Sequence, residues 1–145
     1  MGYTHYFEFR ENVDAFHENV LKKVRKITDK YKDILQFEYD EERPAIVKPT
    51  LIRFNGIDED GHETFYLEPS TGFNFCKTAR KPYDLPICEV LLVLKDYYGT
   101  RFELSSDGFY INDDEEIDGM WEPALENVED MFGITFNKDR LLAGY

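Results

Sequence analysis

A period of two in the apolar and polar residues predicts strands in four stretches of the chain. The stretches are 3–10, 51–57, 62–67 and 73–77. The period arises because the side chains of a strand point alternately to the two faces of its sheet. The residues Asp58-Glu59-Asp60-Gly61 favour a tight turn, so we predict that 51–57 and 62–67 form a β-hairpin. Shorter strands are predicted at 34–39, 101–104 and 134–136.

A period of 3.6 residues predicts three helices. The first is a long amphipathic helix that starts near Asn12 and runs for about twenty residues. The second covers 85–98 and is apolar nearly all round, so we expect it to be buried against the sheet. Asp84 is its expected N-cap and Gly99 its expected end. The third helix begins near Asp118.

This order of elements predicts an α+β fold, in which a mainly antiparallel sheet of about five strands packs with three helices. A chain of 145 residues suits one domain with a substantial core, so we predict a single α+β domain over 1–145. The two cysteines, Cys76 and Cys88, fall in a predicted strand and in the apolar helix. We therefore expect both to be buried, reduced thiols rather than a disulfide.

The charge of the chain excludes several kinds of partner. Lys and Arg number 17 against 30 Asp and Glu, which gives a net charge of −13. Such a field repels duplex nucleic acid, and no apolar run is long enough to span a membrane. No signal peptide opens the sequence, so we expect a cytoplasmic protein. Ten acidic residues and no Lys or Arg lie between Asp107 and Asp130, and an acidic surface of this kind suits a basic protein partner.

Three cations precede the apolar helix and predict a site for phosphate or carboxylate. Lys77, Arg80 and Lys81 would lie near the free N–H groups and the positive end of the helix dipole. The alternative is a solvated basic loop in an acidic protein. Arg53 and Asn55 project side by side from the hairpin in this prediction and would add directed hydrogen bonds. The remaining predicted ligand contacts are Thr78 beside the cations and either Phe75 or Tyr83, which could stack on a base.

Four residues are candidates for acid–base or orienting roles: His5, His62, Glu63 and Asp107. Each also has a structural interpretation. His5 shares a strand face with phenylalanines, where a histidine is usually a hydrogen-bonded packing residue. His62 and Glu63 suit turn polarity and cross-strand pairing, and Asp107 before a glycine suits backbone bonding. We expect no metal and no cofactor, because the spacing of three histidines lacks a metal-binding pattern and the acidic loop 112–119 lacks the closing glutamate of a calcium loop.

Several short motifs of the sequence resemble motifs of a family of small uncharacterised proteins from phages, prophages and bacteria. The motifs are GYTHY at the start, RFNG followed by HETF, FCKTARKPYD, and SSDG before a tryptophan. The resemblance covers about a third of the chain and implies a phage or mobile-element origin and a life in the host cytoplasm. It implies no activity, and the acidic stretch after Gly108 departs from the pattern.

Three functions follow as hypotheses. The first is a module that binds a small phosphorylated, nucleotide-like ligand and sequesters a host defence signal. The second is an acidic inhibitor or decoy that occupies a basic site on a host protein. The third is a small phosphoesterase-type enzyme. The apolar C-terminal residues LLAGY could also dock on the domain or on a second copy of the chain.

Overall fold

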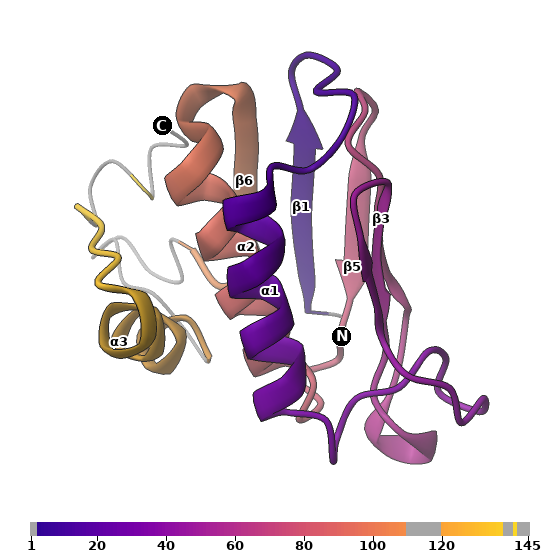
Figure 1. The fold of residues 1–145 in the computed structure, drawn as a ribbon. Coiled ribbons are helices and arrows are strands. Elements are labelled where there is room, and N and C mark those ends of the chain that lie inside the picture. Colours follow the sequence, from indigo (N-terminus) through magenta and orange to yellow (C-terminus); the bar gives the residue numbers. More distant parts are fainter. Residues whose placement is uncertain (1–2, 110–119, 138–140, 142–145) are drawn as a thin grey trace.

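A computed structural model describes residues 3–109, 120–137 and 141 (Figure 1). Among these residues it contains three α-helices, six strands and two short 3-10 turns. In chain order the helices and strands are β1 (Thr4–Phe9), α1 (Glu18–Lys30), β2 (Ile46–Lys48), β3 (Leu51–Phe54), β4 (Phe65–Leu67), β5 (Asn74–Lys77), α2 (Asp84–Tyr98), β6 (Phe102–Ser106) and α3 (Trp121–Phe132).

The strands form two antiparallel sheets of three strands each, in the orders β5-β1-β6 and β2-β3-β4. The α+β class and the antiparallel pairing are thus confirmed, whereas the prediction of about five strands in one sheet is corrected. The predicted hairpin pairs as β3 and β4, but the strands stop at Phe54 and resume at Phe65, and a longer connection with a 3-10 turn at Asp58–Asp60 replaces the tight turn. The next strand, β5, pairs with β1 instead of extending the hairpin. The third strand of the hairpin sheet is β2, in which Ile46 and Val47 are partly buried and Lys48 is exposed, so the strand carries little pattern.

The first helix starts later than its apolar pattern predicted. It begins at Glu18, because the ring Nδ1 of His17 accepts the backbone N–H of Asn19 and caps the first turn. Asp14 has a φ of 47°, which is incompatible with a right-handed helix. The second helix starts at Asp84, with Tyr83 at the N-cap position, and it is buried along nearly its whole length as predicted.

Two predicted strands are absent from the described residues. In 34–39 only isolated bridges form, such as the one between Gln36 and Asn55, and 134–136 is irregular. The third helix ends at Gly133, whose φ of 69° is left-handed. Asp118, the acidic loop 112–119 and all of LLAGY except Leu141 lie outside the described residues.

The helices α1 and α2 lie on one side of the strands (Figure 1). On that side, the side chains of Phe7, Phe9 and Phe102 are at most 2% exposed. Cys76 and Cys88 are both free and buried, as predicted. We call this side of sheet β5-β1-β6 the inner face and the opposite side the outer face. None of the described helices combines the length and the apolar character that crossing a membrane requires.

Candidate functional site

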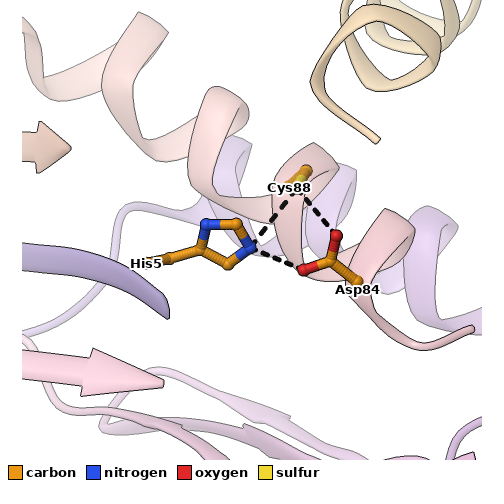
Figure 2. A group of neighbouring side chains, drawn as sticks. All are labelled: His5, Asp84 and Cys88. Carbon is orange, nitrogen blue, oxygen red and sulfur yellow. Dashed lines mark hydrogen bonds and ion pairs between the residues drawn. The ribbon is translucent and has the colours of Figure 1, made fainter. Parts of the chain in front are cut away.

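A buried polar network occupies the inner face where β1 begins. His5 projects from β1 between Ser106 of β6 and Asp84 of α2. Its Nδ1 lies 2.7 Å from Ser106 Oγ, and its Nε2 lies 2.6 Å from Asp84 Oδ1. The Thr78 hydroxyl donates to the same Asp84 oxygen at 2.7 Å. Cys88 Sγ lies 3.7 Å from His5 Nε2 (Figure 2). We call these five residues the inner network.

The fold explains why these residues meet. His5 and Ser106 are partners in the register of β1 and β6, so their side chains share the inner face. Asp84 and Cys88 are four residues apart on α2 and therefore point to the same side of the helix. The loop before α2 places Ala79 and Arg80 at φ values of 52° and 57°. Two consecutive non-glycine residues in the left-handed region store strain, and such strain is frequent at functional sites.

Hydrogen bonding fixes where the protons of the network lie. Ser106 Oγ accepts the N–H groups of Gly108 and of Trp121 Nε1, each at 3.0 Å. Both groups can only donate, so they occupy both lone pairs of the hydroxyl. The hydroxyl hydrogen must then be donated to His5 Nδ1, which leaves the ring proton on Nε2, facing Asp84. Each polar atom in this series of hydrogen bonds is therefore assigned as a donor or an acceptor.

The hydrogen bonds of Ser106 and the burial of Cys88 argue against either residue as a nucleophile in this arrangement. Ser106, His5 and Asp84 have the order of a hydrolase triad, but the Ser106 oxygen has no lone pair left to attack a substrate. Burial, with Asp84 nearby, raises the pKa of the Cys88 thiol well above its ordinary value, so the reactive thiolate is disfavoured. The network as it stands is a stabilising arrangement.

Comparisons with family models, with curated proteins and with solved structures gave no match.

A second candidate lies on the outer face of the same sheet. Phe73 and Phe75 are 63% and 49% exposed, and Tyr6 of β1 is the cross-strand partner of Phe75. The rings of Tyr6 and Phe73 are stacked with centroids 6.1 Å apart, and those of Phe73 and Phe75 are 6.0 Å apart. We call these three residues the aromatic platform. Lys77, two residues beyond Phe75 on the same face of β5, is also exposed.

The residues predicted to bind the ligand divide into two groups. Lys77 and Arg80 are exposed and Lys81 is partly exposed, and the Arg80 guanidinium lies over the Tyr3 ring at 4.1 Å. The others are already engaged within the fold. Arg53 lies over the Phe37 ring and pairs with Glu38, and Asn55 bonds to His62 and Thr64. Thr78 bonds to Asp84. Tyr83 is buried, and its hydroxyl donates to the Glu63 carbonyl.

The described contacts do not bring the four candidate catalytic residues together in one site. His5 is fully buried, whereas His62 is exposed and its backbone N–H donates to Asn55. The Glu63 carboxylate accepts the backbone N–H of Lys77. Asp107 accepts from the Thr4 backbone and the Tyr6 hydroxyl, at 3.1 and 3.2 Å. None of the described contacts joins His5 to His62, so the structure supplies no acid–base pair from the two.

A hollow of ≈ 980 Å³ lies elsewhere, between α1 and the segment 42–47. Arg25, Lys26 and Arg43 line it together with Asp29 and Glu42. Its charges are mixed, and it contains none of the residues that the sequence singled out.

Sequence reasoning missed Ser106, Cys88 and Phe73 as site residues. The spacing of Asp84 and Cys88 on a predicted helix was a usable signal, because residues four apart share a face. No such signal indicated that His5 and Ser106 lie side by side, since they are 101 residues apart in the sequence.

Proposed function

We propose that the protein is a binding module for a small phosphorylated ligand with flat rings, of which a dinucleotide is the simplest example. The aromatic platform carries this proposal. Phe73 and Phe75 leave much of their apolar surface in water beside Lys77. Exposed apolar patches mark binding surfaces, and the face of an aromatic ring stacks on any base.

The expected binding energy favours two bases over one. Stacking contributes about 1–3 kcal/mol per base, and an exposed ion pair such as Lys77 with phosphate contributes about 0.2–1 kcal/mol. A mononucleotide therefore reaches a Kd of about 1 mM at best, which corresponds to about 4 kcal/mol. Two bases, one on Phe73 and one on Phe75, raise this to about 7 kcal/mol at best, which corresponds to a Kd of about 10 μM.

Charges on the outer face orient the ligand. Lys77 and Arg80 lie at the end of β5 that leads to α2. Glu8 and Glu103 are cross-strand partners further along β1 and β6, and Glu103 is paired with Arg10. Lys77 and Arg80 supply positive charge at their end, so we assign the phosphate there and the bases to the platform, although Asp107 contacts Tyr6 and Glu63 accepts the Lys77 backbone N–H at that same end.

The resemblance to phage and prophage proteins suggests what such binding would achieve, namely the sequestration of a host nucleotide signal. The acidic-decoy hypothesis remains a prediction, because much of its surface between Asp107 and Asp130 lies outside the described residues. The phosphoesterase hypothesis also remains a prediction, and no contact among the described residues favours it.

Calorimetric titration with 5′-phosphorylated dinucleotides at low salt tests the proposal. Phe73→Ala and Phe75→Ala should each weaken binding about tenfold, since each removes about 1.4 kcal/mol of stacking. Lys77→Ala should weaken it by a smaller factor that disappears as salt is raised. Tyr39→Ala is the matched control, because Tyr39 is 48% exposed and lies outside the sheet of the platform.

Two results would contradict the proposal. One is binding that Phe73→Ala, Phe75→Ala and Tyr39→Ala leave equally unchanged. The other is the absence of heat with every dinucleotide up to millimolar concentration.

A further inference from the structure

We propose that the inner network holds a divalent transition-metal ion of the zinc type, with His5 Nε2, the Asp84 carboxylate and Cys88 Sγ as its ligands. Figure 2 shows the three side chains converging from β1 and from one side of α2. Their ligand atoms all lie within 4.8 Å of one another, and all three residues are 0% exposed. A nitrogen, a sulfur and carboxylate oxygens are the donors that zinc prefers.

These residues supply three of the four ligands of a tetrahedral ion, and their separations fit after small adjustments. Zinc bonds of about 2.0–2.1 Å to nitrogen and about 2.3 Å to sulfur place those two atoms about 3.6 Å apart. The observed distance from Cys88 Sγ to His5 Nε2 is 3.7 Å, and that from Cys88 Sγ to Asp84 Oδ2 is 4.0 Å. The distance from His5 Nε2 to Asp84 Oδ1, now 2.6 Å, would have to widen by about 0.7 Å, and with Oδ2 as the ligand its distance to Cys88 Sγ would have to shorten by about 0.4 Å.

The charges also balance in the metal-bound state. The ion carries two positive charges, and the Asp84 carboxylate and a Cys88 thiolate carry one negative charge each, while the imidazole is neutral. The set is therefore neutral overall, as a site with no solvent exposure requires. Binding releases the thiol proton of Cys88 to the solvent, and no electron is transferred.

A second residue contacts each of two ligands, although Ser106 would have to change from donor to acceptor when the metal binds. His5 Nδ1 contacts Ser106 Oγ, and Asp84 accepts from Thr78, so both ligands are held by a second residue. Asp84 and Cys88 come from one helix and His5 from a central strand, which are rigid elements.

Metal binding has a consequence for Ser106 that can be measured. The ion would take the lone pair of Nε2, so the ring proton would move to Nδ1 and be donated to Ser106 Oγ. That oxygen already accepts from Gly108 and from Trp121, and a third donor forces one of these bonds to lengthen. Trp121 is the only tryptophan of the chain, and its ring lies 5.1 Å from that of His5, so its fluorescence reports on the site.

Cobalt is the probe for the test, because a thiolate bound to Co²⁺ gives a charge-transfer band in the near ultraviolet. The full chain is refolded under reducing conditions with Co²⁺ alone, since the site is closed in the folded protein. The parent should show the band, bind one equivalent of Co²⁺ and lose tryptophan fluorescence. One equivalent of Zn²⁺ should abolish the band.

The two cysteines provide a matched pair of variants, because both are free and 0% exposed. Cys88→Ser should lose the band, and its affinity for Zn²⁺ should fall by at least about 100-fold. Cys76→Ser should keep both. Parent protein without the band, or an equal band in refolded Cys88→Ser, would overturn the proposal. Should Cys88→Ser not refold, Cys88→Ala replaces it, and the result with the parent still decides.

Discussion

His5 and Tyr6 are neighbours on β1 and belong to opposite environments. On the inner face, His5 and the groups around it have a hydrogen-bond partner for each polar atom, and Asp84 and Cys88 are fully buried with it. On the outer face, Tyr6 joins two phenylalanines that water reaches. The inner face fixes its protons and rings in place, whereas the outer face leaves apolar surface uncovered. Changes on the inner face should therefore lower stability, whereas changes on the outer face should weaken ligand binding.

The largest expected effect on stability is that of Asp84→Ala. It removes the acceptor of both His5 and Thr78 inside the protein and leaves two buried donors unsatisfied at about 1–3 kcal/mol each, so the free energy of unfolding should fall by about 2–6 kcal/mol. Asp96→Ala, on the exposed side of the same helix, should change it by less than about 0.5 kcal/mol. Urea denaturation measures both. Equal losses in the two variants would mean that the network does not stabilise the fold.

An intermediate effect is expected for Gly108→Ala. The new methyl group would lie 2.1 Å from the Tyr3 hydroxyl and 2.8 Å from Trp121 Cδ1, so the variant should lose about 1–3 kcal/mol of stability and shift its tryptophan emission. Gly133→Ala is the control, because the added methyl group meets open space there. Because Gly133 has a left-handed φ of 69°, alanine at this position should lower stability by about 1 kcal/mol without changing the emission. Unaltered emission in Gly108→Ala would contradict the described packing.

The smallest effect concerns pH on the outer face. A hydrogen bond to Glu103, together with desolvation and the charge of Glu103, raises the pKa of Glu8 above its ordinary value. A carboxyl group with a raised folded pKa stabilises the protein below its unfolded pKa, and this contribution is lost as the pH rises through the folded pKa. In Glu103→Gln the pKa of Glu8 should fall, so less stability should be lost above about pH 4.5.

Carboxyl NMR titration gives this pKa directly. Arg10→Gln should move the pKa of Glu8 in the other direction, because the charge of Arg10 lowers it. Equal pKa values in the two variants would mean that Glu8 does not sense Glu103.

The sequence predicted the individual helices and strands better than it predicted which of them pack together. The apolar run of α2, with Gly99 after it, allowed its extent to be predicted almost to the residue. The start of α1 was missed because the apolar stripe continues back to Val13 and Phe16, while the helix begins only after the His17 cap. The face of His5 was predicted correctly, since Phe7 and Phe9 share its period and are buried with it.

The pairing of strands could not be predicted in the same way. A period of two assigns side chains to faces but does not say which strands are adjacent. Arg53 and Asn55 were expected to project together toward a ligand, yet Asn55 bonds its own loop and Arg53 stacks on Phe37, which the pattern of 34–39 did not indicate. The inner network likewise depends on contacts between residues about 80 and 100 positions apart.

The most direct test of the central claim is an amide NMR titration of the isotope-labelled protein with a 5′-phosphorylated dinucleotide. Binding to the aromatic platform predicts concentration-dependent shifts confined to outer-face positions of β1 and β5, centred on Phe73, Phe75 and Lys77, and absent in Phe75→Ala. Shifts centred instead on the hollow beside α1, around Arg25 and Arg43, would contradict the account.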